Sequence, residues 1–325
     1  MQSLLERRYP EGGAAVEEHI CQRRACVQPS PGYTILCEDK TFQDELVLGG
    51  QPMVATRPGD LPDFANPPVV ETVLSVQFEP LSQMRAAHFG LFWGQIRGRY
   101  PKTEERPSLD SAIERFPEPA RPRLGLQFPV LEVPPLPRFW FIHGNENELI
   151  QLQADRFIKN WRKSGEGDAY PRYEKVRDWF EQDFREFQEF VKKEKLGSIE
   201  VNQCEVTYVN HIVAGEGWGG HEDLDKVFTV WRHPAATIPG KAEDAVFHAR
   251  FPIRDGSGHP VGRLHTDVQA ALRNSDGKPM FVFNLTARGY LGRSTEFLDL
   301  GREWIVRSFA EMTTKKMHRV WERRQ

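Results

Sequence analysis

The side chains best suited to chemistry lie on one stretch of the chain, between residues 245 and 290, where polar and apolar residues alternate. The polar set that this alternation places on one side includes His248, Arg250, His265, Asp267 and Arg288. The two arginines supply forked hydrogen-bond donors and His265 lies between them, so these three predict an anion-binding site. His248 beside Asp267 would orient an imidazole for acid–base chemistry.

The register of the strands decides which of these side chains meet. Residues 275–278, Ser-Asp-Gly-Lys, predict a two-residue hairpin turn. The longer connection over residues 254–260 is less decisive, but keeping the apolar faces together permits Arg250 near His265 and His248 near Asp267. The expected cross-strand rows are Arg250, His265, Arg288 and His248, Asp267, Thr286.

The same residue types have two further interpretations. Arg, His, Asp and Thr are common on a sheet face that is solvated or covered by another protein, where each cross-strand pair contributes only about 0.2–1 kcal/mol. The open interpretations are therefore a solvated or protein-covered face, an anion or nucleic-acid contact, and catalysis. Elsewhere the sequence contains no readable nucleophile with its base and orienting group.

A metal or cofactor is not expected. His19, Cys21, Cys26 and Cys37 have types that ligate zinc, but they lack a paired Cys-x-x-Cys, so we interpret them as ordinary thiols. Four cysteines in a chain of this length indicate reduced thiols.

Three antiparallel strands must position the candidate residues: Ala245–Ile253, Gly262–Leu272 and Pro279–Tyr290. Their opposite face is apolar, with Phe247, Ala249, Phe251, Leu264, Val268, Phe281, Phe283 and Leu285.

The remaining chain repeats one order of elements. A strand after Asn66-Pro67-Pro68, a helix from about Ser82 to Tyr100, three strands and a long helix come first, and a strand, a short helix, three strands and a long helix follow. The first three strands are Arg138–His143, Glu148–Gln153 and Arg156–Trp161, which we expect to be apolar on both faces. The long helices are Pro171–Leu196 and Glu296–Trp321. Eight prolines between Pro107 and Pro137 predict a wrapping loop.

These patterns predict an α+β fold with an internal duplication. Residues 66–197 and 198–325 would be two half-units, each strand, helix, three strands, long helix, which together form one extended, curved antiparallel sheet with helices on one face. Residues 66–325 would make one compact domain. Residues 1–65, broken by Gly and Pro pairs, would be an extension that packs on the body or is partly mobile.

Bulk composition sets the functional class. With 325 residues, 39% hydrophobic and 27% charged, the chain has a soluble globular composition. No apolar run reaches the roughly 20 residues of a membrane helix, and residues 1–8 lack signal-peptide features, so we expect a cytoplasmic protein with no membrane partner. The net charge of −3 gives no general attraction to nucleic acid.

Several segments resemble a known family. They are Asn66-Pro-Pro-Val-Val-Glu71, His88-Phe-Gly-Leu-Phe-Trp93, Arg99-Tyr-Pro101, Tyr208-Val-Asn-His211 and Gly301-Arg-Glu-Trp-Ile-Val306 with Phe309. Over residues 66 to 323 the chain resembles a sporadically distributed bacterial family of uncharacterised proteins whose domain opens with Asn-Pro-Pro-Ile/Val-Val-Glu. The resemblance implies no catalytic residues, and the family's patchy distribution implies an accessory or defence-type setting.

Together these observations predict a non-enzymatic interaction or sensing module that binds a protein partner or a second copy of itself. The alternative is binding of an anion, a nucleotide or nucleic acid on the polar sheet face, through Arg250, His265, Arg288, His248 and Asp267. A hydrolase of unfamiliar design is the third hypothesis.

Overall fold

The computed structural model describes residues 61–116, 136–165, 167–215, 217–231, 240, 242–292 and 294–324. These residues belong to one compact unit, Gly50–Gln325. The predictions for residues 1–60, including the thiols Cys21, Cys26 and Cys37 and the neighbouring His19, lie outside the described residues.

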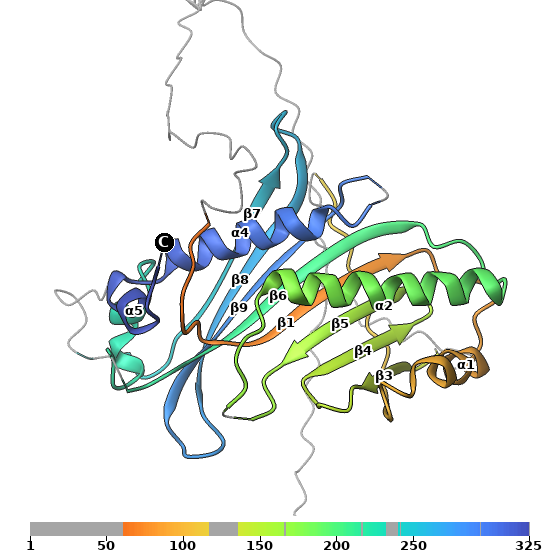
Figure 1. The fold of residues 1–325 in the computed structure, drawn as a ribbon. Helices are drawn as coiled ribbons and strands as arrows, with labels where there is room; N and C mark the ends of the chain where they lie inside the picture. Colours follow the sequence, from red (N-terminus) through yellow and green to blue (C-terminus); the bar gives the residue numbers. More distant parts are fainter. Residues whose placement is uncertain are drawn as a thin grey trace, which may run out of the picture. The chain divides into compact units, whose positions relative to one another are not determined.

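Nine strands of the described chain form a single antiparallel sheet in the order β2-β3-β4-β5-β1-β6-β9-β8-β7 (Figure 1). They are β1 (Val69–Phe78), β2 (Lys102–Arg106), β3 (Arg138–Ile142), β4 (Glu148–Gln153), β5 (Arg156–Arg162), β6 (Val201–Val213), β7 (Val246–Arg254), β8 (Pro260–Leu272) and β9 (Pro279–Gly289). The helices described are α1 (Ala86–Ile96), α2 (Tyr173–Lys193), α3 (Leu224–Val227), α4 (Phe297–Met312) and α5 (Lys315–Val320), with a 3-10 turn at His221–Asp223. The predicted α+β class with one antiparallel sheet is confirmed.

β1 and β6 form the central pair of the sheet. β5, β4, β3 and β2 follow on one side, and β9, β8 and β7 on the other. α2 packs on β5 and β1, whereas α4 packs on β9, β6 and β8. β2, which the sequence pattern does not predict, pairs with β3 at one edge of the sheet.

The helix α2 is held to the sheet by aromatic side chains. Its buried stripe follows the helical spacing of three and four residues and includes Tyr173, Val176, Phe180, Phe184, Phe187 and Val191. The ring centroid of Phe187 lies 5.5 Å from that of Phe157 and 5.4 Å from that of Phe92. Because burying one such side chain contributes about 1.5–3 kcal/mol, the stripe is a principal anchor of α2.

One charged cluster is sealed under α2. Lys159 of β5 has no exposed side-chain surface, and its Nζ donates to Glu148 Oε2 and Asp183 Oδ2, both at 2.8 Å, and to the Tyr100 hydroxyl at 2.6 Å. Asp183 also accepts from Nη1 of Arg99 at 2.6 Å. A buried ammonium is tolerated only with such partners, so the bond from Lys159 to Asp183 fixes α2 to β5.

The predicted helix Glu296–Trp321 is in fact two helices, and this prediction was wrong in detail. α4 ends because Thr313 is extended, with φ −108° and ψ 150°, and its hydroxyl donates to the carbonyl of Phe309. Thr314 then caps α5 by accepting from the backbone N–H of Met317. The apolar period runs on through both helices, so periodicity does not reveal the break.

Candidate functional site

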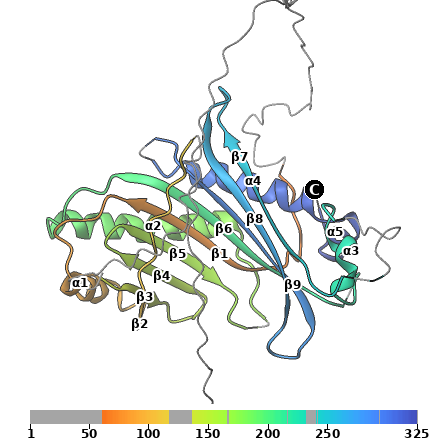
Figure 2. The same ribbon diagram turned by 180° about the vertical axis from the view of Figure 1, so that it is seen from behind.

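An extended segment, Pro107–Phe116, crosses the polar face of the sheet in Figure 2, and we call it the strap. It follows β2 and contacts side chains of β4, β5, β1, β6, β9 and β8 in turn. The proline pattern predicts a wrapping loop over residues 107–137. The strap fits that expectation, while residues 117–135 lie outside the described residues.

Besides Arg263, which is described below, three glutamines and Arg156 of the sheet bond to the main chain of the strap. The contacts are Leu109 N to Gln153 Oε1 (3.0 Å), Gln153 Nε2 to Leu109 O (3.1 Å), Arg156 Nη2 to Asp110 O (2.8 Å), Ala112 N to Gln77 Oε1 (3.2 Å) and Glu114 N to Gln203 Oε1 (2.8 Å). Because these bonds use backbone groups, they are available to any extended chain whatever its side chains.

Alternate residues of the strap face the sheet. Ala112, Glu114 and Phe116 are partly buried, whereas Ile113 and Arg115 are exposed. This period of two is that of an extended strand, so the strap presents Glu114 to the sheet.

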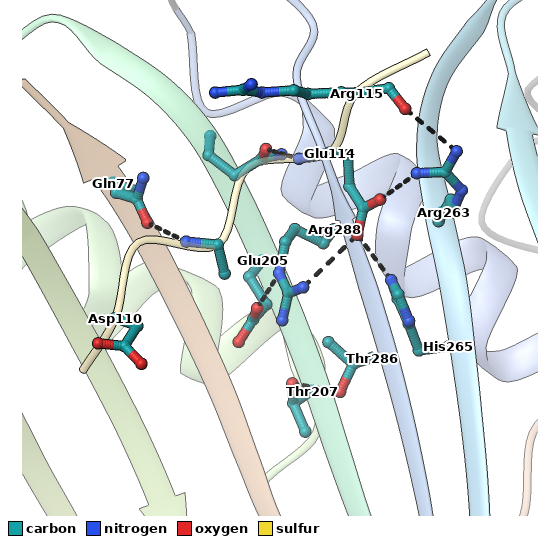
Figure 3. Close-up of polar contacts among 12 residues, drawn as sticks. Gln77, Asp110, Glu114, Arg115, Glu205, Thr207, Arg263, His265, Thr286 and Arg288 are labelled. Carbon is teal, nitrogen blue, oxygen red and sulfur yellow. Dashed lines mark hydrogen bonds and ion pairs between the residues drawn. The ribbon is translucent and has the colours of Figure 1, made fainter. Parts of the chain in front are cut away.

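The carboxylate of Glu114 is the centre of the site, as Figure 3 shows. Only 8% of the Glu114 side chain is exposed. His265 Nε2 lies 2.6 Å from Oε1, Arg263 Nη1 donates to Oε2, and Arg288 Nη1 lies 3.5 Å from Oε1. Glu205 of β6 holds Arg288 from the other side by accepting from its Nε at 2.5 Å. β8 and β9 therefore form an anion site, and the strap's own carboxylate occupies it.

Arg263 also binds the end of the strap. Its Nη2 donates to the carbonyl of Arg115 at 3.1 Å, and its guanidinium carbon lies 4.2 Å from the centroid of the Phe116 ring. A guanidinium at this distance from an aromatic ring makes a favourable cation–π contact. Arg263 thus recognises a charge, a backbone carbonyl and a ring at once.

The surroundings of Glu114 lower the pKa of its carboxyl group. Burial acting alone would raise this pKa, since it disfavours the charged form. The hydrogen bonds from His265 and Arg263 and the positive charge of Arg288 outweigh burial. In neutral solution the strap is therefore bound through a true carboxylate.

The β7–β8 register agrees with the expected rows, and the β8–β9 register is shifted by two residues. The observed pairs are Arg250 with His265, His248 with Asp267, His265 with Thr286, Asp267 with Asn284 and Arg263 with Arg288. The loop between the strands is Asn274–Gly277, closed by a bond from Arg273 N to Lys278 O at 2.8 Å, and so is longer than the predicted two-residue turn. An even shift leaves every side chain on its face.

The five candidate residues therefore have different positions. His265 and Arg288 both contact Glu114. Arg250 of β7 lies opposite His265 of β8 in the strand register. His248 Nδ1 lies 3.8 Å from Asp267 Oδ2, which is too long for a hydrogen bond, and the His248 side chain is 53% exposed. His248 and Asp267 are thus neighbours that form no hydrogen bond.

Three residues of the site were missed by sequence reasoning: Glu114, Glu205 and Arg263. Arg263 has the same parity as His265 and Asp267, so the alternation alone could have included it. Glu114 gives no such signal, because it lies in a proline-rich segment 149 residues from Arg263.

The first three-strand group is also more polar than expected. Gln151, Gln153, Arg156 and Asn160 are buried on its polar face, so the prediction that residues 138–161 are apolar on both faces was wrong. The strap explains this burial in part, because Gln153 and Arg156 bond to its main chain.

In the part of the chain that the structure describes, no group of three or more His, Cys, Asp and Glu side chains could hold a metal ion. Cys204 is buried, and burial raises the pKa of its thiol to about 12. No helix among the described residues is long and apolar enough to span a membrane. Comparison of the chain with protein-family models, with curated proteins and with solved structures finds no match.

Proposed function

We propose that this protein is a non-enzymatic interaction module that binds an extended, acidic segment of a protein partner on the polar face of its sheet. One observation carries the proposal: the strap lies on this face as an extended peptide, with its main chain bonded to side chains of the sheet and its carboxylate among Arg263, His265 and Arg288. The family resemblance supports a bacterial accessory or defence-type setting.

Main-chain contacts and carboxylate contacts have different roles in recognition. The glutamines Gln77, Gln153 and Gln203 bond to main-chain groups and so supply affinity for an extended chain. Arg263 and Arg288 bond to a carboxylate and so select an acidic residue at one position. A partner segment of the same kind would replace the strap contact for contact.

The strap competes with any partner from within the chain. A tethered segment has an effective concentration of about 1 mM when its linker is short and flexible. A partner segment must therefore bind the sheet tightly enough to displace the strap, or another event must first release the strap. The module is therefore expected to bind weakly while the strap is docked and more tightly when it is released.

We also infer that residues 66–197 and 198–325 are two copies of one unit, with α2 and α4 on the same face of the sheet. Strand order supports this, since outward from β1 come β5, β4 and β3, and outward from β6 come β9, β8 and β7. The cross-strand row Lys159, Leu74, Val206 and Ala287 supports the placement of the helices, because α2 contacts Lys159 and Gly301 of α4 adjoins Ala287. Figure 1 is consistent with this placement. The strap crosses both copies, so one occupant contacts both.

A peptide-binding experiment tests the proposal. Glu114→Lys places a positive charge among the cations and should expel the strap. A labelled peptide with the sequence of residues 107–116 should then bind the variant at least about tenfold more tightly than the wild type, measured by fluorescence anisotropy. Circular dichroism and thermal unfolding confirm that the variant is folded.

Two controls make the result specific. The same peptide with Gln at the position of Glu114 should bind the Glu114→Lys variant more weakly, and adding Arg263→Ala to that variant should remove the difference between the two peptides. Equal binding of both peptides to Glu114→Lys, or no binding of either, would contradict recognition of an acidic segment.

A second candidate function is binding of phosphate groups of nucleotides or nucleic acid. The convergence of Arg263, Arg288 and His265 on one anion favours it, because the same donors suit a phosphate. A single-stranded oligonucleotide that binds Glu114→Lys, loses affinity steeply with added salt and fails to bind after Arg263→Ala would support this candidate over the peptide.

A further inference from the structure

A second site lies on the apolar face of the sheet, away from the strap. It is a cavity of about 360 Å³ between the first turn of α2, the middle of α4 and the strands β6 and β9. Residues 61–67 line it before β1 begins, and a bond from Ala65 N to Glu322 O at 3.0 Å holds them in place. The proposed function makes no use of this cavity.

Much of the cavity wall is apolar. Val69, Leu285, Ile305 and Phe309 line it, and all four are buried. A cavity of about 150 Å³ with such a lining holds benzene, so 360 Å³ has room for about two fused rings with a small substituent. Its volume falls within the usual range of small-molecule sites.

Two tyrosine hydroxyls form a polar spot on this wall. Tyr170 and Tyr208 line the cavity, and their hydroxyl oxygens lie 2.8 Å apart. Burial raises the pKa of both phenols, so both stay protonated in neutral solution. The two hydroxyls carry two protons and share one hydrogen bond, and Arg302 acts as a donor to the Tyr208 hydroxyl, so one phenol proton remains to donate to a ligand.

Arg302 provides a positive charge whose hydrogen-bonding capacity is only partly used. Its Nε is buried and has no hydrogen-bond partner among the described residues. Its nearest carboxylate is that of Glu174, at 3.4 Å, on a side chain that is 67% exposed. Arg172, also in the wall, already donates to Asp63 at 3.0 Å and to the carbonyl of Phe64 at 2.9 Å.

We infer that this cavity binds a small organic carboxylate with a flat apolar body. The apolar wall takes the body, Arg302 pairs with the carboxylate, and a phenol proton of the Tyr170–Tyr208 pair donates to it. A guanidinium bound to a carboxylate forms the strong charge-assisted bonds that Glu174 supplies only weakly from the solvent side.

The test uses two ligands of equal shape. Binding of 2-naphthoate and of naphthalene-2-carboxamide to the full chain is measured by calorimetry and by ligand-observed NMR. 2-Naphthoate should bind at least about tenfold more tightly than the amide. Arg302→Met should abolish this preference, whereas Arg319→Met, at an exposed position on α5, should preserve it.

Further variants locate the binding. Val306→Phe, which fills the cavity, should weaken both ligands, and Glu114→Lys and Arg263→Ala should leave the binding of both unchanged. Equal affinity of acid and amide, no binding of 2-naphthoate, or loss of binding in Arg263→Ala would overturn the inference. Peptide binding by the strap variants is measured in a separate experiment, so a negative result with 2-naphthoate does not affect the proposed function.

Discussion

Replacing Glu114 by Gln should loosen the strap while leaving the sheet intact. The amide keeps the size of the side chain but removes its charge, and its N–H group must face the donors of Arg263 or His265. A hydrogen bond to a charged group contributes about 1.5–3 kcal/mol, and the carboxylate accepts two close ones. Some of this is recovered, because the side chains of Arg263 and His265 are 12% and 21% exposed and one bond to the amide oxygen remains. We expect a net loss of about 2 kcal/mol, or about 30-fold in the docking equilibrium.

Hydrogen exchange measures this loss directly. The backbone N–H groups of Leu109, Ala112 and Glu114 donate to glutamine side chains, so they exchange with solvent only when the strap opens. Their exchange should become about 30-fold faster in Glu114→Gln, while amides within β1 and α2 keep their wild-type rates.

A matched substitution in the same segment is Asp110→Asn, which also converts a carboxylate to an amide but at an exposed position. It should leave the exchange of the strap within about twofold of the wild type. Unchanged rates in Glu114→Gln, or equal acceleration in Asp110→Asn, would contradict the role assigned to the Glu114 carboxylate.

Three further outcomes are expected. Docking lowers the pKa of Glu114 below its ordinary value of 4.5, so the charge contribution to docking is complete above pH 4.5 and is lost as the pH falls below it. Amide exchange in the strap, corrected for intrinsic rates, should therefore rise on acidification in the wild type. It should not rise in Glu114→Gln. Lys159→Met leaves two buried carboxylates without their cation and should lower the free energy of unfolding by about 3–5 kcal/mol in urea titrations, against less than about 0.5 kcal/mol for exposed Lys163→Met. Gly289→Ala would drive a Cβ into the ring of Phe297 and should cost about 1–3 kcal/mol by the same measurement, and an unchanged midpoint would contradict the packing described.

The sequence predicts the local features of this protein and not those that join distant segments. The alternation in β7, β8 and β9 assigns each side chain to a face, because a period of two is set by neighbouring residues alone. Predicting the β8–β9 register would have required the conformation of the loop at residues 274–277. A bond from Gly277 N to Arg273 O stabilises a turn there that is longer than the predicted one. An error of two residues moved Arg288 opposite Arg263 rather than His265.

The candidate site was half predictable for the same reason. His265 and Arg288 follow from strand alternation, and their identity as anion ligands follows from their chemistry. The anion itself, Glu114, belongs to a segment with no periodic pattern, and only the folded sheet brings it to β8. The role of Gln77, Gln153 and Gln203 could not be predicted from the sequence either, because a glutamine that binds another segment does not differ in pattern from any other glutamine in a strand.

The central pairing of β1 with β6 has a consequence for how the chain folds. The meanders β3-β4-β5 and β7-β8-β9 connect neighbouring segments, but Leu74 pairs with Val206 across more than a third of the chain. Closing so long a loop is entropically costly and slow compared with forming a hairpin. We expect each meander to form early and the β1–β6 contact to form in the rate-limiting step. Substitutions at Leu74 or Val206 should therefore slow refolding, whereas those within the strap should mainly speed its release.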